Sequence, residues 1–393
     1  MDKNIMEAVE RVKACYQDGI VNFGDDSRIV KCMRRALAGE KLTIAFLGGS
    51  ITQGCNASTP QGCYAYRTYH WWEENFPEAE IFYWNAGIGA TTSHLGVARL
   101  KEDVMSQRPD FVIVEFSVND EDVNPHFEET YESLIRQILE TPWKPALMLV
   151  HNVRYDDGGN AELIHRPIGE RYHLPSVSMK PVIYAKVAEG VLDKRAITAD
   201  DLHPNDLGHE LVAGVITNYL DGVKKKAVSM GAKRDCGGEA DKEDNFLPLP
   251  IAMTKSSYEA VTRYRNYQID PVENHGFMKD ETPQKCISDC FKRGWMAKEK
   301  GAIITFKTQG ENLAVQYRKT VRKPAPIATL YLDGDRKNGH VLDANFTEDW
   351  GDCIYLQTIL EHGRPGEHTV TIEITSASVE DAECFYLVSL IFG

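Results

Sequence analysis

Three polar residues have the types and the placement that nucleophilic catalysis requires. Ser50 lies in FLGGSITQG, directly after an apolar run, and Asp200 and His203 lie in TADDLHPNDLGHE. A serine becomes a nucleophile only when a base removes its proton and a carboxylate orients that base. The three-residue offset lets one loop hold the Asp200 carboxylate against the His203 imidazole, and it favours Asp200 over the adjacent Asp201. These residues predict acyl transfer with Ser50 as the nucleophile.

Acyl transfer also needs hydrogen-bond donors for the developing oxyanion, each worth about 3 kcal/mol in the transition state. The loop GIGATTS can present the backbone N–H of Gly89 or Ala90, and SVND can present the side-chain amide of Asn119. The N–H of Ser50 is a further candidate. Read alone, each motif is also typical of a capped turn. All of them follow successive elements, however, and ligand sites of open parallel sheets lie at the carboxyl edge, so we expect one oxyanion hole there.

The elements that must position these residues alternate between short β-rich runs and longer helical patterns. Four runs are almost continuously apolar, as expected for strands buried on both faces. This alternation predicts a parallel sheet covered by helices on both faces. The expected strands are 42–48, 80–86, 110–116 and 145–152, and the expected helices are 63–75, 92–107, 127–140, 178–192 and 206–222.

A second pattern begins after residues 224–247, a segment rich in charge, Gly and small residues that we interpret as a linker. In HTVTIEITS, Val370, Ile372 and Ile374 alternate with polar residues, which is typical of a half-buried antiparallel strand. Further runs of this kind, separated by turn signals, predict a β-sandwich. The expected domains are therefore 1–223, with an N-terminal helical segment, and 248–393.

Composition and charge exclude several classes of protein. The 393 residues carry 44 Lys and Arg against 58 Asp and Glu, a net charge of -14, which repels nucleic-acid phosphates. No stretch approaches the roughly 20 apolar residues of a membrane span. The N-terminus lacks the apolar core of a secretory signal, so we expect a cytoplasmic protein whose nine cysteines are thiols. We expect neither nucleic acid nor a membrane as a partner.

The motifs around Ser50, Asn85 to Ser93, Asn119 and Asp200 with His203 resemble, in order, four blocks of the SGNH hydrolases, also called the GDSL family. The resemblance covers about residues 40 to 222 and implies a three-layer α/β/α sandwich without cofactor or catalytic metal. It implies Ser50 as nucleophile, Asn119 in the oxyanion hole, and Asp200 and His203 as the other triad members. Three positions depart from the family pattern. Gly49 replaces the Asp that precedes the nucleophile in the family, and that Asp is not a triad member. Ser117 replaces a Gly in the third block, and Ala90 aligns with the oxyanion Gly, which keeps Gly89 as an alternative donor.

A sandwich appended to such a domain resembles the microbial two-domain carbohydrate esterases, in particular the acetylmannan esterases. The resemblance implies removal of O-acetyl groups from mannooligosaccharides, an acetylated oligosaccharide as the substrate, and a carbohydrate-binding role for a jelly-roll-like second domain. It is also compatible with a homodimer. Sugars stack on aromatic rings, and Trp350, Trp295 and Tyr267 lie in turn-rich segments. Trp350, in FTEDWGD, is the favoured candidate, and we expect it to reach the Ser50 pocket.

Two other functions stay open. A lipase or thioesterase of the same fold would prefer longer acyl chains and would not need a sugar-binding module. A catalytically silent carbohydrate-binding protein would use the α/β domain as a scaffold, although the complete set of Ser50, Asp200 and His203 argues against it. The sequence does not identify the polysaccharide or the acetylated hydroxyl.

Overall fold

A computed structural model describes residues 3–232 and 248–393. The chain divides into two compact units. The first lies within residues 1–256 and the second within 257–393, except that residues 97–99 group with the second. Among the described residues, no helix is both long and apolar enough to cross a bilayer.

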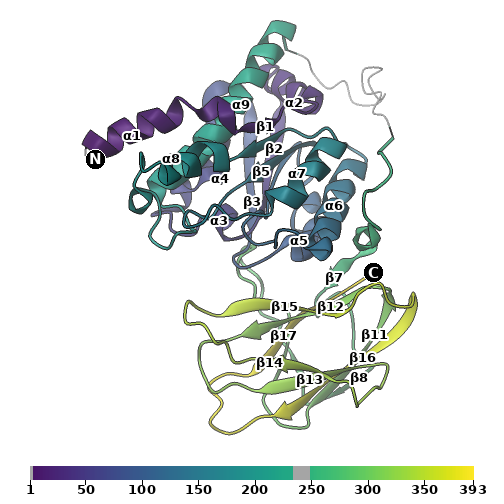
Figure 1. Cartoon of the computed structure of the whole chain (residues 1–393). Coiled ribbons are helices and arrows are strands. Elements are labelled where there is room, and N and C mark those ends of the chain that lie inside the picture. The colour runs from purple at the N-terminus through teal and green to yellow at the C-terminus, as the bar shows by residue number, and fades with distance from the viewer. Residues whose placement is uncertain (1–2, 233–247) are drawn as a thin grey trace. The chain divides into compact units, whose positions relative to one another are not determined.

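The first unit is built on a six-stranded sheet in the order β1-β6-β5-β4-β2-β3 (Figure 1). The strands from β6 to β3 run parallel, and β1 pairs antiparallel with β6 at one edge. The predicted parallel sheet is thus confirmed, with one antiparallel edge. β1 and β6 are three residues long, too short for an apolar run to reveal them. The strands are β1 (Ile20–Asn22), β2 (Lys41–Gly48), β3 (Glu80–Gly87), β4 (Phe111–Glu115), β5 (Ala146–His151) and β6 (Ser176–Ser178).

Helices cover both faces of this sheet, as the continuously apolar strands require. One face packs through Phe46, Ile113 and Met148 against α1 (Lys3–Lys13), α2 (Ser27–Leu37), α4 (Tyr64–Asn75) and α9 (Asp206–Met230). Figure 1 shows α5 (Ser93–Asp103), α6 (Pro125–Glu140) and α7 (Glu162–Arg171) together on the other side. The short helices α3 (Ser50–Gln53) and α8 (Ala185–Ala188) complete the unit. This is the three-layer α/β/α arrangement predicted from the sequence.

The second unit consists of two antiparallel sheets. One has the order β15-β12-β17-β10-β9, with β7 beside β17, and the other has the order β14-β13-β16-β11-β8. Val370, Ile372 and Ile374 are buried between them, as their alternation predicts. The antiparallel second domain is thereby confirmed. The strands are β7 (Thr262–Tyr264), β8 (Glu273–His275), β9 (Met278–Lys279), β10 (Trp295–Ala297), β11 (Ile303–Gly310), β12 (Leu313–Lys319), β13 (Ile327–Leu332), β14 (His340–Asp343), β15 (Cys353–Leu360), β16 (Gly366–Ser376) and β17 (Phe385–Phe392).

Two segments differ in detail from the sequence-based expectations. The helix expected at 178–192 is regular α-helix only over Ala185–Ala188, following a π-helical turn at Lys180–Tyr184. α9 continues to Met230, into the expected linker, and residues 233–247 of that linker lie outside the described residues. Beyond the gap, the backbone N–H groups of Met253 and Thr254 donate to the Glu132 carboxylate at 2.7 Å, so these residues pack in the first unit.

Candidate active site

Ser50 is the first residue of α3, directly after the carboxyl end of β2. Its side chain is almost completely buried, with the residue 6% exposed. Packing explains why the preceding residue is Gly49. A Cβ at that position would lie 2.2 Å from the Asn119 side-chain oxygen. Only glycine therefore lets the Asn119 amide approach the backbone beside Ser50. The GGS motif thus lets Asn119 pack against the backbone next to Ser50.

The imidazole of His203 connects Ser50 to Asp200. His203 Nε2 lies 2.8 Å from Ser50 Oγ, and His203 Nδ1 lies 2.8 Å from Asp200 Oδ2. Because a carboxylate accepts hydrogen bonds, Nδ1 carries the proton and Nε2 is free to accept the Ser50 hydroxyl proton. The structure therefore brings together the nucleophile, base and carboxylate that the sequence singles out, in hydrogen-bonding geometry for general-base catalysis.

The loop around Asp200 holds its carboxylate in place. The backbone N–H groups of Leu202 and His203 donate to Asp200 Oδ1 at 3.1 and 2.8 Å. Partial burial raises the pKa of Asp200, but the hydrogen bonds from His203 and Leu202 outweigh burial and lower it to about 2. The carboxylate thus stays ionised across the neutral range. Asp201 turns away instead, and pairs with Lys194 at 2.9 Å and Arg195 at 2.5 Å, which agrees with the choice of Asp200.

Asn56 is a contact of this site that the sequence analysis did not single out. Its side-chain amide donates to Asp200 Oδ2 at 3.3 Å, and its backbone adopts a left-handed conformation with φ of 64°. His209 holds the backbone next to Asn56. Its Nδ1 accepts from Tyr64 N at 3.2 Å, and its Nε2 lies 3.2 Å from the Cys55 carbonyl oxygen. In the sequence, the only sign of this role is an Asn six residues after Ser50, a residue type that tolerates left-handed turns. Many turns contain such an Asn, so the sequence alone does not assign Asn56 to the site.

The GIGATTS loop lies directly against Ser50. A Cβ at Gly89 would lie 3.8 Å from Ser50 Cβ. The Gly89 N–H, however, donates to the Gln53 side chain at 2.6 Å and is already occupied. Ala90 adopts φ of 55°, a left-handed conformation that glycine would reach more easily. Of the two alternatives, the geometry favours the Ala90 N–H as the oxyanion donor, because no described residue accepts a hydrogen bond from it.

The Asn119 amide lies beside this loop, after the carboxyl end of β4. Its Oδ1 is buried and has no hydrogen-bond partner among the described residues. This oxygen faces Gly49, the residue before Ser50. Ser117, which replaces a Gly of the family pattern, donates through both its N–H and its hydroxyl to Glu115 Oε1 at 2.9 and 2.8 Å. The substitution therefore ties the turn to the end of β4.

The second unit contains the aromatic candidates. Trp350 is 55% exposed, and its ring makes an edge contact with Phe346 at 5.0 Å while its indole N–H donates to Glu348. Trp295 is completely buried in the sandwich core, so its interpretation as a surface residue was wrong. It lies on β10 between two paired strands rather than in a loop. Tyr267 is exposed, with the Arg293 guanidinium over its ring.

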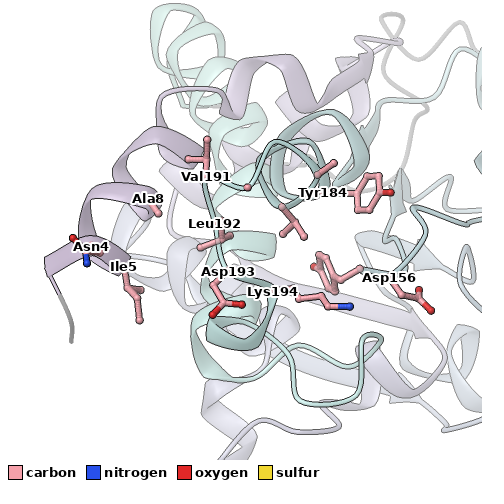
Figure 2. A pocket seen from close by; sticks show the side chains of 13 residues that line it. Asn4, Ile5, Ala8, Asp156, Tyr184, Val191, Leu192, Asp193 and Lys194 are labelled. Carbon is pink, nitrogen blue, oxygen red and sulfur yellow. The ribbon is translucent and has the colours of Figure 1, made fainter.

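A separate cavity of about 530 Å³ lies between α1, α8 and the segment before Lys194. Figure 2 shows the side chains that line it, including Ile5, Tyr184 and Asp193. None of the residues that surround Ser50 lines this cavity. The hydrogen-bonded chain from Ser50 to Asp200, rather than the size of a cavity, therefore identifies the candidate active site.

Comparisons with known proteins agree with this chemistry. Residues 46–211 match the model of the GDSL-like Lipase/Acylhydrolase family. A crystal structure of a two-domain esterase (CEX) active on acetylated mannans is 50% identical, with a TM-score of 0.89 over 96% of this chain and 98% of that chain. The same kind of esterase co-crystallised with mannopentaose is 49% identical, with a TM-score of 0.89 over 96% and 97% of the two chains. No curated protein sequence matches the chain.

Fold, site and comparisons together define a serine esterase. Within that class, the chain belongs to the GDSL-like lipase and acylhydrolase family, as the order of its motifs predicted.

Proposed function

We propose that this esterase removes O-acetyl groups from mannooligosaccharides through a Ser50–His203–Asp200 acyl-enzyme mechanism. The observation that carries the proposal is the hydrogen-bonded chain from Ser50 Oγ through His203 to Asp200, in a protein that matches an esterase active on acetylated mannans over 96% of its length. A net charge of -14 favours neutral sugar esters over acyl-CoA, whose phosphates it would repel.

The reaction begins when Ser50 Oγ attacks the acetyl carbonyl carbon while His203 Nε2 takes the hydroxyl proton. Asp200 stabilises the imidazolium that forms. The tetrahedral intermediate then collapses, the C–O bond to the sugar breaks, and His203 returns the proton to the sugar oxygen. Water repeats the sequence on the acetyl-enzyme, which releases acetate and restores Ser50. Atoms and protons balance without any further reactant.

The oxyanion is held by the N–H groups of Ser50 and Ala90 and by the Asn119 amide. Gly89 is the less suitable donor because its N–H is occupied by Gln53. These donors lie at the start of α3 and in the two loops that follow β3 and β4. The negative charge that develops in the transition state therefore meets fixed dipoles rather than mobile water. This arrangement supports catalysis by electrostatic preorganisation.

Residues 248–393 are proposed to contribute a carbohydrate-binding surface, with Trp350 as a stacking residue. Its exposure supports this role, since an indole in a sandwich core would be buried, as Trp295 is. The indole N–H bond to Glu348 and the contact with Phe346 hold the ring in one orientation. A rigid exposed ring stacks on a sugar with little loss of conformational entropy.

The test is acetate release from acetylated manno-, xylo- and chito-oligosaccharides, alongside hydrolysis of aryl acetate, butyrate and octanoate. We expect release from the manno-oligosaccharide, preference for the acetate among the aryl esters, and loss of both activities in Ser50→Ala. Fast octanoate turnover without sugar deacetylation would replace the proposal with a lipase or thioesterase. Sugar binding by an inactive wild-type protein would replace it with a carbohydrate-binding protein. Release from xylo- or chito-oligosaccharide alone would overturn the mannan assignment.

A further inference from the structure

Asp120, the residue after Asn119, is a buried carboxylate that the proposed reaction does not use. Its side chain is completely buried. Asp120 Oδ1 accepts the backbone N–H of Ser93 at 2.8 Å, and Asp120 Oδ2 lies 3.0 Å from His165 Nε2. A buried carboxylate is costly unless its lone pairs are satisfied, so these two contacts determine where Asp120 lies.

The partner His165 is fixed in its turn. It lies on α7, its side chain is completely buried, and its ring stacks on Tyr131 from α6 with centroids 3.6 Å apart and planes 8° apart. Because Nε2 faces a carboxylate, it carries the proton, while Nδ1 has no hydrogen-bond partner among the described residues. The stacked ring therefore acts as a rigid donor to Asp120.

Asp120 connects the two loops that supply oxyanion donors. Ser93 begins α5, three residues after Ala90, and Asp120 directly follows Asn119. The backbone N–H groups of Asn119 and Asp120 both donate to the Phe116 carbonyl oxygen at 3.0 Å, so the turn is short and stiff. A displacement of Asp120 would therefore move both donors. Ser93 begins α5, Tyr131 lies on α6 and His165 lies on α7. These three helices lie together in Figure 1.

We propose that Asp120, held by His165, is a positioning residue that sets the separation between the Ala90 N–H and the Asn119 amide, and thereby the geometry of the oxyanion hole. The inference rests on the proposed function of Ser50, Ala90 and Asn119. Among the described residues, the hydrogen bonds of the Asp120 side chain go to Ser93 and His165 and not to Ser50. It acts through Asn119 and through the loop of Ala90, and a displacement of about 1 Å in such a donor costs about 100-fold in rate.

A double-mutant cycle with Asn119→Ala tests this inference, with an aryl acetate as the substrate. Asp120→Asn retains an acceptor for the Ser93 N–H but places its amide against His165. We expect kcat to fall by about 10- to 100-fold with KM within about twofold. In the Asn119→Ala background the same change should cost several-fold less than in the wild type, because one of the two donors that Asp120 positions is absent. Equal losses in the two backgrounds, or a single-variant loss below about twofold, would overturn the inference.

Three further variants separate positioning from stability. Asp110→Asn is the matched control, because Asp110 lies at the opposite end of β4, where it accepts from Thr43 N at 2.8 Å and pairs with Arg35 at 2.5 Å. It should lower the unfolding temperature and leave kcat unchanged. If Asp120→Asn does not fold, His165→Phe and His165→Gln carry the test. We expect kcat to fall in the first and to be largely rescued in the second, which keeps a donor for Asp120. Equal kcat values in both would contradict the role.

Ser50→Ala distinguishes the failure of this inference from failure of the proposed function. Aryl acetate hydrolysis that survives Ser50→Ala would refute the proposed mechanism. An inactive Ser50→Ala together with additive effects of Asp120→Asn and Asn119→Ala would refute the positioning role alone.

Discussion

Replacing Asp200 with asparagine removes one negative charge while nearly preserving the shape of the side chain. The asparagine amide can adopt two orientations, and each loses something. With its oxygen on the backbone N–H groups of Leu202 and His203, it retains those bonds, but its NH₂ faces His203 Nδ1. The imidazole must then carry its proton on Nε2 and can no longer accept the Ser50 proton.

The opposite orientation retains the productive tautomer but breaks the two backbone hydrogen bonds, at about 1 kcal/mol each. A difference of about 2 kcal/mol leaves about one molecule in thirty competent. The imidazolium in the transition state also loses its partner. An ion pair near a protein surface is worth about 4 kcal/mol at 4 Å, and because the Asp200 side chain is 47% exposed, screening reduces this to about 2 kcal/mol. Together the two effects predict a fall in kcat of about 1000-fold.

The assay is steady-state hydrolysis of an aryl acetate near pH 8, with Asp201→Asn as the matched control. The Asp201 carboxylate pairs with the partly exposed Lys194 and Arg195. Such pairs are worth about 0 to 1 kcal/mol, so we expect kcat of Asp201→Asn to stay within about twofold of the wild type. An Asp200→Asn enzyme that retains more than about a tenth of the wild-type kcat would refute the tautomer argument. A large loss in both variants would point to collapse of the loop instead.

Three other predictions follow from the structure. Trp350→Ala should lower kcat/KM for the acetylated oligosaccharide by about tenfold and leave the aryl acetate unchanged, whereas equal effects on both substrates would contradict a stacking role. Ala90→Gly should retain kcat within about twofold, because the backbone N–H remains. It should raise the free energy of unfolding by about 0.5 kcal/mol, because glycine adopts the left-handed conformation without the strain of alanine. A large fall in kcat would count against the Ala90 N–H as the oxyanion donor. Burial lowers the pKa of His151 to about 3 and that of His209 to about 4, so between pH 6.5 and 5 only the unfolded state takes up these protons. The free energy of unfolding therefore falls on acidification, by up to about 1.4 kcal/mol per pH unit for each histidine. His209→Gln should flatten this dependence in urea unfolding, and an unchanged slope would show that the residue does not contribute.

The sequence predicted what depends on short motifs and missed what depends on packing. Ser50, Asp200 and His203 could be named because acyl transfer requires those residue types, and because strand ends share one edge of a parallel sheet. The hydrogen-bond partners of Asn56 and Asp120 could not be predicted from the sequence. Their contacts are with Asp200, 144 positions away, and with His165, 45 positions away, and no periodicity reports such pairs.

The sequence likewise predicted side-chain burial only in strands with a regular alternation of apolar and polar residues. The alternation of Val370, Ile372 and Ile374 predicted their inward direction correctly, because side chains of a strand alternate between two faces. Trp295 lies in a strand of three residues surrounded by turn-like sequence, and its burial follows from its two paired neighbours, β9 and β17. The choice between Gly89 and Ala90 depended on the Gln53 side chain, which the local sequence does not place.

The hydrogen bond between Ser50 and His203 closes a loop of 153 positions. Contacts at such sequence separation form late in folding, because the entropy of closing the loop is lost before the contact is gained. During refolding, the recovery of hydrolytic activity therefore reports completion of the first unit. The helix content of α4 or α6 can recover earlier, because helices form from local contacts. In a refolding experiment the two signals should separate in time. On the ribosome, a chain shorter than about 203 residues contains Ser50 but lacks His203. Under the proposed mechanism, the growing polypeptide therefore acquires catalysis only after nearly the whole α/β layer has been synthesised.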